Sequence, residues 1–556
     1  MKTTLKIKQL LFLTFLIFNS AFCIAQNWQW AKHIGGGLYD GGTHMIGDKT
    51  GNVYLTGGYY GPNCQFQTTL ASTNGYNDFF LAKYDNSGNE LWVKTIGGNN
   101  SSSEFEGIAG IAYDSINSFI YITGSYYPGA TFGSTMLSGV GQGFFVAKYD
   151  LNGNCIWAKG SNGGGTTNGN GVAVDSAQNV YVCGENTSAI NIGSNTVAAG
   201  GFMAKYDASG NCLWAIKKFR YVSGAPSELE ACGLKIYKSS ILIAGYTAND
   251  TVIVDTITNI KNSLHSVFLA SFDLNGNVKW LKRFGGGGDS FGGYDFCIDK
   301  NGNSYVGGTF SVSGKFDTLT LTDPMNDDAF LSKWDINGKL KWVRQLHANS
   351  SSGISANGQN VYTNGNGDTY FTGWFTNTIS CGTNTLTATT AQDMFVAAYD
   401  SSGNCFGATR FGYGYSQGMA VFADNSGTFW LQGDFLNTVN IGSTSFHSDG
   451  DQDIFIAKSN SIVGIESRKA NSGNNQLSIY ANPTQGKCNI TVPDDLLHEK
   501  NLVLSIYSSN GKLIQQTPVE VKQDKVVVNL EEEAKGTYNV TLGNSKKMYT
   551  GKIVFE

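Results

Sequence analysis

Apolar and polar residues alternate on both sides of a short polar turn in the stretch 80–98, and this pattern predicts a β-hairpin. The turn at 85–89 reads Asp-Asn-Ser-Gly-Asn, and all of these residues favour turns. The pattern returns along the chain in steps of 57 to 66 residues, each copy beginning at an apolar anchor: Phe80, Phe145, Phe202, Phe268, Phe330, Phe395 and Phe455. Such a period indicates a repeat architecture built from strands.

The second strand of the hairpin carries a tryptophan in the first five copies: Trp92, Trp157, Trp214, Trp280 and Trp342. The sixth copy has Gly407 at this position, and no tryptophan strand follows the seventh anchor. At the other end of the chain, residues 30–36 match residues 92–98 but have no anchor before them. Because the two incomplete copies complete each other, we predict that the N-terminal strand pairs with the strand at 455–460 and closes a ring.

Two further strand candidates lie between successive anchors, for example 110–113 and 119–124. Four strands in about 60 residues make a propeller blade, somewhat longer than the ~40–45 residues of WD40 units. The predicted fold is therefore all-β. It consists of a seven-bladed β-propeller of four-stranded blades over residues 26–460, closed by the N-terminal strand, and a small C-terminal β-sandwich.

Three recurring motifs carry a resemblance to a known family: Trp-x-Lys-x-Ile-Gly-Gly, Gly-x-x-x-Asp-x-x-Gly-Asn-x-Tyr-x-x-Gly and Phe-x-Ala-Lys-Tyr-Asp-x-x-Gly. They resemble the bacterial β-propeller repeat family from about Trp28 to Asn460. The resemblance implies a shared scaffold and no common reaction.

The repeat pattern stops after residue 460, and residues 461–475 have the polar composition of a linker. Residues 476–556 contain six alternating segments, enough for a small β-sandwich. This tail resembles the C-terminal sorting domain of the type IX secretion system of Bacteroidetes at 479–483, 506–512, 536–540 and 552–554, with Ala481 in place of a proline usual in the motif. The resemblance implies recognition by the secretion machinery. An ordinary accessory sandwich is the alternative.

The N-terminus has three lysines, then an apolar run at 10–18 and then small residues, which is the layout of a signal peptide over residues 1–25. We therefore expect export to the periplasm and then a secreted or outer-membrane surface location. Lipidation at Cys23 is disfavoured by the bulky Phe22 before it. No later stretch approaches the ~20 apolar residues of a membrane-spanning helix, so the mature chain should have no transmembrane segment.

Loss of the leader lysines takes the formal charge from −5 to −8. An acidic chain without a basic stripe is not expected to bind nucleic acid.

Nine of the ten cysteines follow the leader. Cys155, Cys212 and Cys405 share one repeat position, so they would lie on different blades, too far apart to bridge, and are expected to be small buried residues. The Asp-x-x-Gly-Asn turns lack the further carboxylates of a calcium loop, and hairpin turns explain them better. The tryptophan copies also resemble the docking motif of quinone-dependent dehydrogenases, but the adjacent cysteine pair of those enzymes is missing. Neither a metal nor a cofactor is predicted.

Loops that join each tryptophan strand to the next blade combine aromatic residues with carboxylates, which suits carbohydrate or peptide binding. The candidate ligand-binding residues are Tyr39, Asp40, Glu104, Glu106, Glu228, Glu230, Asp289, Tyr294 and Tyr415. The alternative is that these residues only fill and solvate the rim.

The predicted function is a secreted or cell-surface binding or adhesion module with a glycan or protein ligand. A carbohydrate-active enzyme, either a glycoside hydrolase or a lyase, is the alternative, because sequence does not give the separation of paired carboxylates. No catalytic residue is predicted.

Overall fold

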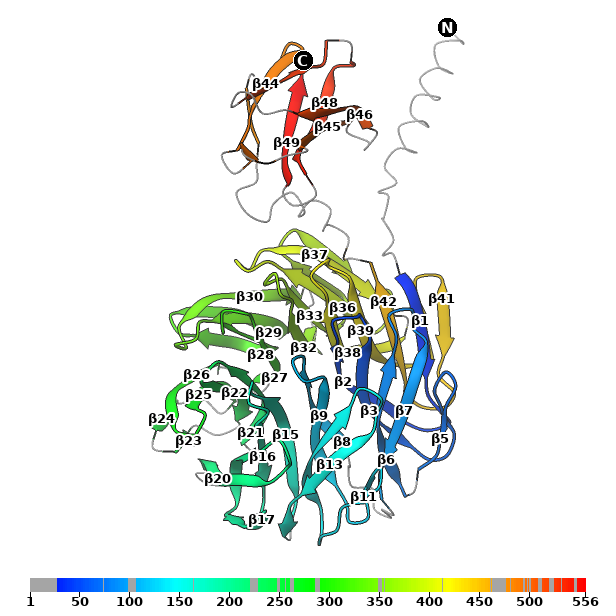
Figure 1. The fold of residues 1–556 in the computed structure, drawn as a ribbon, viewed down its shortest axis with the longest axis vertical. Coiled ribbons are helices and arrows are strands. Elements are labelled where there is room, and N and C mark those ends of the chain that lie inside the picture. Colours follow the sequence, from blue (N-terminus) through cyan, green and yellow to red (C-terminus); the bar gives the residue numbers. More distant parts are fainter. Residues whose placement is uncertain are drawn as a thin grey trace. The chain divides into compact units, whose positions relative to one another are not determined.

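The computed structural model divides into two compact units, residues 1–463 and 464–556 (Figure 1). The described residues are 28–460, 462 and 477–556, without the following positions: 74, 99–106, 164, 221–228, 248–250, 256, 261–264, 286–290, 349–352, 355, 413, 481, 494–495, 498, 500–501, 509–512, 520–524, 532 and 545–547. The predicted signal peptide and most of the predicted linker lie outside this set. In the part of the chain that the structure describes, no helix is both long and apolar enough to cross a bilayer.

The first unit is built from sheets that repeat one strand order along the chain. The first three contain β2 (Asp40–Gly47), β3 (Val53–Tyr60), β6 (Asn77–Tyr84) and β7 (Glu90–Ile96); β8 (Gly107–Asp114), β9 (Phe119–Tyr126), β12 (Gly143–Asp150) and β13 (Cys155–Gly160); and β15 (Thr167–Val174), β16 (Val180–Asn186), β19 (Gly200–Tyr206) and β20 (Cys212–Arg220). The next three contain β21 (Leu229–Tyr237), β22 (Ser240–Thr247), β25 (Ser266–Asp273) and β26 (Val278–Phe284); β27 (Phe291–Ile298), β28 (Ser304–Phe316), β29 (Leu319–Trp334) and β30 (Leu340–Ala348); and β32 (Ala356–Thr363), β33 (Thr369–Phe375), β36 (Asp393–Tyr399) and β37 (Cys405–Phe411). The last contains β38 (Tyr415–Ala423), β39 (Phe429–Leu436), β42 (Asp453–Ser459) and β1 (Trp28–Ile34).

Short hairpins fill the extra length before most anchors. They are β4 (Cys64–Gln65) with β5 (Leu70–Ala71), β10 (Thr131–Phe132) with β11 (Thr135–Met136), β17 (Ile190–Ile192) with β18 (Asn195–Val197), β23 (Thr251–Val254) with β24 (Ile257–Ile260), β34 (Thr378–Cys381) with β35 (Asn384–Thr387), and β40 (Thr438–Ile441) with β41 (Thr444–His447). Two shorter strands, β14 (Asn162–Gly163) and β31 (Gly353–Ile354), pair with β17 and β29. The hairpin turns need a left-handed residue, which Gly193 (φ 58°) and Gly442 (φ 63°) supply without a Cβ penalty.

The anchor phenylalanines form the centre of the packing. All seven lie in the third strand of their sheets and have no exposed surface. The third strand of the first sheet, β6, is buried along its whole length, whereas the fourth strand, β7, is partly exposed. A strand buried on both faces is expected to be apolar along its length, and a half-exposed strand is expected to alternate apolar and polar residues. This difference in burial explains why the two strands of the repeated hairpin differ in sequence pattern.

The N-terminal strand completes the last sheet, as predicted. β1 pairs antiparallel with β42, with His33 opposite the anchor Phe455. In Figure 1 the blue β1 lies beside the yellow β42. The strand therefore joins the two ends of the repeat region.

A recurring tryptophan hydrogen bond links neighbouring sheets. The indole Nε1 of Trp92 donates to the carbonyl of Leu151, in the turn of the next sheet, at 3.1 Å. The same bond, at 3.1 to 3.2 Å, joins Trp157 to Ala208, Trp280 to Ile336 and Trp342 to Ser401. Trp30 of β1 donates in the same way to Asn86 of the first sheet, at 3.1 Å. The tryptophans therefore bind between sheets, and Trp30 extends the series from the last sheet to the first.

The Asp-x-x-Gly-Asn segments are tight turns. Asp85 Oδ1 accepts the backbone N–H groups of Ser87 and Asn89, and its Oδ2 accepts Asn89 Nδ2 at 2.9 Å. Gly88 takes the left-handed position with φ 81°. The turn uses both oxygens of its own carboxylate, as the hairpin interpretation predicts.

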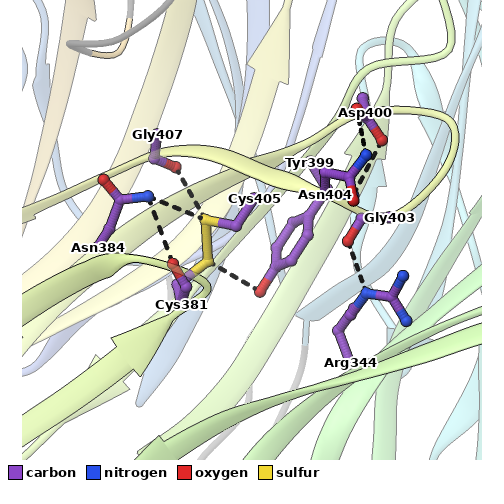
Figure 2. Close-up of a disulfide and its surroundings, with 9 residues drawn as sticks. All are labelled: Arg344, Cys381, Asn384, Tyr399, Asp400, Gly403, Asn404, Cys405 and Gly407. Carbon is purple, nitrogen blue, oxygen red and sulfur yellow. Dashed lines mark hydrogen bonds between the residues drawn. A yellow bond between two sulfur atoms is a disulfide. The ribbon is translucent and has the colours of Figure 1, made fainter.

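Cys381 and Cys405 form a disulfide, with Cα atoms 6.0 Å apart (Figure 2). The expectation that the cysteines are unpaired small residues is wrong for this pair. Cys405 bonds to Cys381, which lies in the β34–β35 hairpin of the same repeat. The repeats that contain Cys155 and Cys212 have Phe132 and Ile192 at the position of Cys381. Cys155 and Cys212 are accordingly free thiols.

Removing this disulfide should destabilise the first unit. Cys381→Ser/Cys405→Ser should lower the free energy of unfolding by about 3 kcal/mol, because the bridge restrains a loop of 24 residues in the unfolded chain. The matched control is Cys212→Ser, at the equivalent position without a bridge, and it should cost less than about 1 kcal/mol. Urea unfolding followed by circular dichroism measures both. Equal effects of the two variants would contradict a stabilising bridge.

The second unit has two sheets. One contains β43 (Ser478–Tyr480), β44 (Lys487–Thr491) and β47 (Lys525–Asn529), and the other contains β46 (Leu513–Val519), β45 (Leu502–Ser508), β48 (Gly536–Gly543) and β49 (Met548–Phe555). Residues of both sheets, including Ile490 and Val540, share one core. The sequence pattern missed β46, an edge strand with mostly exposed side chains and an internal proline, which only an edge tolerates.

Candidate functional site

Three of the nine predicted ligand-binding residues have described side chains: Tyr39, Asp40 and Tyr415. Glu104, Glu106, Glu228 and Asp289 lie outside the described residues. Glu230 and Tyr294 belong to β21 and β27, but their side chains are not among those described. The candidate residues with described side chains therefore lie where the first and last sheets meet.

Asp40 begins β2 in the first sheet, and Tyr415 begins β38 in the last. The two sheets are neighbours here, because the backbone N–H of Gly42 donates to Asp434 Oδ1 of β39 at 2.9 Å. Residues almost 400 positions apart thus form one surface.

Four tyrosines gather at this junction, and we call them the tyrosine patch: Tyr39, Tyr60, Tyr76 and Tyr415. The rings of Tyr39 and Tyr60 pack edge to face at 5.7 Å, and those of Tyr60 and Tyr76 at 5.5 Å. Burial, then the charge of Asp434, and finally that of Tyr415, raise the pKa of Tyr39 to about 12. Tyr39, Tyr76 and Tyr415 are nevertheless 44, 49 and 42% exposed, so the patch is open to solvent.

Buried acids lie next to the patch. Asp40 and Asp453 have no exposed surface, and Asp434 is 3% exposed. Gln452 Nε2 donates to Asp434 Oδ2 at 3.1 Å, and the backbone N–H of Tyr60 donates to Asp40 Oδ1 at 3.3 Å. Burial, and then the Asp453 charge, raise the pKa of Asp40 to about 8. Burial also raises the pKa of Asp434. At neutral pH Asp40 and Asp434 are therefore largely protonated and act as neutral hydrogen-bonding groups.

Neutralising Asp40 should change how stability depends on pH. Its pKa in the folded state lies above the ordinary value, so the folded state holds a proton that the unfolded state has released between about pH 4 and 8. Stability should therefore fall as pH rises through this window. Asp40→Asn should reduce the fall and raise the melting temperature at pH 8 relative to the wild type.

Asp85→Asn is the control for this experiment. Asp85 lies in an exposed turn. Burial raises its pKa, but the hydrogen bonds from Asn89, Ser87 and Gly88 together outweigh burial, so the net pKa of Asp85 is lowered. This substitution should not stabilise the protein at pH 8. A wild-type melting temperature that does not change between pH 5 and 8 would contradict the prediction for Asp40.

Two groups of described residues have the spacing of a metal site: His33, Asp449 and Asp453, and Asp323, Asp328 and His347. In the first group, His33 Nε2 lies 2.6 Å from Asp453 Oδ2. The equivalent aspartate of the sixth sheet, Asp393, makes the same contact with Arg410 at 3.0 Å. Since an arginine can replace the histidine, we interpret this contact as a structural link between the third and fourth strands.

Three cavities among the described residues of the first unit bear on the location of a site. One of about 380 Å³ is lined by Gly133, Tyr149, Gly153 and Cys155, and one of about 300 Å³ by the repeat-equivalent Gly382, Tyr399, Gly403 and Cys405. The second of these borders the disulfide in Figure 2. Because the two share a repeat position, we interpret them as packing gaps of the repeat.

The third cavity, of about 480 Å³, has residues of the first, second, sixth and seventh sheets in its wall, among them Asp48, Tyr113, Tyr362 and Trp430. None of the residues predicted from the sequence lines it, because it lies at the Asp turns and not at the loops after the tryptophan strands. The signal in the sequence was Trp430, which replaces a tyrosine that other repeats have at this position, such as Tyr54.

Comparison with known families accounts for the tail and for one repeat. Residues 478–556 match the secretion system C-terminal sorting domain, and residues 160–188 match the beta-propeller repeat. The chain carries β-propeller repeats and a type IX sorting domain. The sorting domain supports export and a secreted or cell-surface location.

Similar proteins extend the comparison to longer stretches. An uncharacterized WD repeat-containing protein of Acanthamoeba polyphaga mimivirus is 29% identical over 73% of this chain and 36% of that protein. This chain thus spans about a third of the relative's length.

Two solved structures are also similar. A gluconolactonase from Xanthomonas campestris is 12% identical, with 62% of this chain and 93% of that chain covered and a TM-score of 0.27. A glycoside hydrolase family 32 protein from Bifidobacterium adolescentis is 9% identical, with 95% of both chains covered and a TM-score of 0.24. At these scores the likeness says nothing about activity.

In the sorting domain, the first and last motif segments meet. Asn482 Nδ2 donates to the carbonyl of Lys552 at 2.6 Å, and Asn482 Oδ1 accepts the backbone N–H of Val554 at 2.7 Å. The backbone N–H of Leu477 donates to the carbonyl of Thr550 at 2.8 Å. The domain therefore presents its two terminal motifs as one surface.

Proposed function

We propose that this protein is an exported seven-bladed β-propeller that binds a glycan or a protein at the cell surface or in the medium. In this proposal the seven sheets are the blades, and β1 closes the ring. Residues 1–25 are a signal peptide, residues 461–475 a linker, and residues 476–556 a sandwich that the type IX machinery recognises. The tryptophan bonds between consecutive sheets, including Trp30 to Asn86, support the closed ring.

The tyrosine patch is the observation that carries the binding role. Exposed tyrosines on a rigid scaffold offer large apolar faces with polar edges, at little conformational cost. Sugar rings and extended peptides both pack on such faces. The polar groups nearby include amides and the protonated carboxyls of Asp40 and Asp434, and Gln417 Nε2 donates to the Tyr415 hydroxyl. This environment favours a neutral ligand such as a glycan chain.

A glycan array probed with the full chain tests the proposal. We expect retention on a defined set of glycans, and we expect Tyr39→Ala/Tyr415→Ala to weaken it at least about tenfold, because central aromatic residues dominate binding energies. The control is Leu91→Ala/Leu213→Ala, which removes side chains that are 50 and 52% exposed on the fourth strands of the first and third sheets and do not belong to the patch. The control should bind like the wild type.

Retention that survives loss of the patch would contradict the proposed site. Absence of binding to glycans and to cell-surface proteins would contradict the binding role. Hydrolysis or elimination of a bound glycan would support the alternative, a carbohydrate-active enzyme on the same scaffold.

A further inference from the structure

The cavity of about 480 Å³ differs from the other two because four sheets form its wall. Tyr113, Tyr362 and Phe422 contribute aromatic side chains, and the rings of Tyr362 and Phe422 pack edge to face at 5.0 Å. Its volume falls in the range of small-molecule sites, roughly 300–1,000 Å³. It is separate from the tyrosine patch, with which it shares no residue.

The Asp turns of the first, third and fifth sheets show how such a turn is normally completed. Asp48 Oδ2 accepts Asn52 Nδ2 at 2.8 Å and the Tyr54 hydroxyl at 3.2 Å. The same two bonds reach Asp175 from Asn179 and Tyr181, and Asp299 from Asn303 and Tyr305. In each case an asparagine and a tyrosine occupy the second carboxylate oxygen.

The turn of the seventh sheet lacks both of these partners. Thr428 replaces the asparagine, and Trp430 replaces the tyrosine. Asp424 Oδ1 accepts the backbone N–H groups of Ser426 and Thr428, but no hydrogen bond from the described residues reaches Oδ2. Trp430 is 1% exposed, and its indole N–H is buried without a hydrogen-bond partner. Asp424 and Trp430 both line the cavity.

Buried polar groups are normally hydrogen-bonded, so an unpaired indole N–H indicates a missing partner. Two residues that line the cavity thus carry unpaired polar atoms, the acceptor Oδ2 on Asp424 and the buried indole N–H donor on Trp430, next to aromatic side chains. Asp48 and Asp424 are its carboxylates, and Lys49 lines it as well. Lys458 Nζ lies 4.8 Å from the Trp430 ring centre. Lys458 does not line the cavity, but it interacts electrostatically with Asp424. A charged ligand of either sign would therefore meet a like charge in or beside the cavity, whereas a neutral ligand would not.

We propose that this cavity binds a neutral polyol, such as a single sugar ring. One hydroxyl of the ligand donates to Asp424 Oδ2, another accepts the N–H of Trp430, and the apolar face of the ring packs on the aromatic wall formed by Tyr113, Tyr362 and Phe422. The site does not depend on the function proposed for the tyrosine patch.

The test gives the Asp424 turn the asparagine and the tyrosine that complete the equivalent turns of the first, third and fifth sheets. Saturation-transfer NMR and calorimetry on the full chain would use methyl α-glucoside, methyl α-mannoside and methyl β-galactoside as probes, with tetramethylammonium and acetate as charged ones. We expect at least one glycoside to bind. Thr428→Asn/Trp430→Tyr should weaken its binding at least about tenfold, because the added side chains would occupy Asp424 Oδ2 themselves.

The double variant introduces the asparagine and the tyrosine that complete the turns at Asp48, Asp175 and Asp299. Its melting temperature should therefore be equal to that of the wild type or higher. Tyr39→Ala, which changes only the tyrosine patch, should leave glycoside binding at this cavity unchanged. The proposal is overturned if none of the three glycosides binds, if the double variant binds as tightly as the wild type, or if a charged probe binds more tightly than every glycoside.

Discussion

Deletion of residues 26–36 should unfold the repeat unit or convert it to oligomers. The deletion removes β1, which supplies the fourth strand of the last sheet. It exposes the backbone edge of β42, and an unpaired edge is a template for pairing with another chain. It also removes Ile34, a fully buried residue that belongs to a core shared with Val53 of the first sheet and Ile456 of the last.

The expected cost of this deletion is more than about 5 kcal/mol. Loss of one large buried side chain alone costs about 2–5 kcal/mol, and the strand hydrogen bonds are lost as well. Natural domains have a total stability of only about 5–15 kcal/mol. Thermal unfolding by circular dichroism and elution volume in size-exclusion chromatography would measure the effect. An unchanged melting curve together with monomeric elution would show that the repeat unit does not depend on β1.

Point variants make this test sharper. Trp30→Ala removes only the bond to Asn86 and the packing of one ring on the first sheet, whose Gly88 lies directly against that ring. Trp92→Ala removes the equivalent bond between the first and second sheets. If β1 is an ordinary blade strand, the two substitutions should destabilise the protein by similar amounts.

The sequence predicted the repeat core well because seven degenerate copies carry the same information. The buried anchors, the Asp turns and the pairing of β1 with β42 all follow from aligning the copies. Features found in one copy only are a different case. The Cys381–Cys405 disulfide needs a cysteine in a hairpin that the other repeats fill with Phe132 or Ile192, so aligning Cys405 with Cys155 and Cys212 pointed away from it.

The candidate site was predicted only in part for the same reason. Tyr39 and Tyr415 lie at loops that the sequence pattern identified. Tyr60 ends β3 and Tyr76 immediately precedes β6, outside those loops. Asp434 and Asp453 come from the far end of the chain and reach Gly42 and His33 only because β1 and β2 lie against the last sheet. Contacts of such long range have no local signature, so only the structure could place these acids beside the tyrosines.

Removal of residues 476–556 should abolish surface display and leave the repeat unit in the periplasm. We expect the secretion machinery to recognise the surface of the sorting domain. In that domain the first and last motif segments are joined through Asn482, which is hydrogen-bonded to Lys552 and Val554. Asn482→Ala should therefore reduce display as well, and Thr517→Ala, at an exposed position of the edge strand β46 outside these motifs, should not. Cell fractionation with immunoblotting and protease shaving of intact cells would measure surface protein.

A failure of folding must be separated from a failure of sorting. The sorting domain has its own core, which contains no residue of the repeats. The chain that ends at residue 475 should consequently keep the melting transition of the repeat unit while it loses display. Normal surface display of this truncated chain would refute the sorting role. Loss of the melting transition would instead show that the repeats need the tail to fold, and the separate cores argue against that outcome.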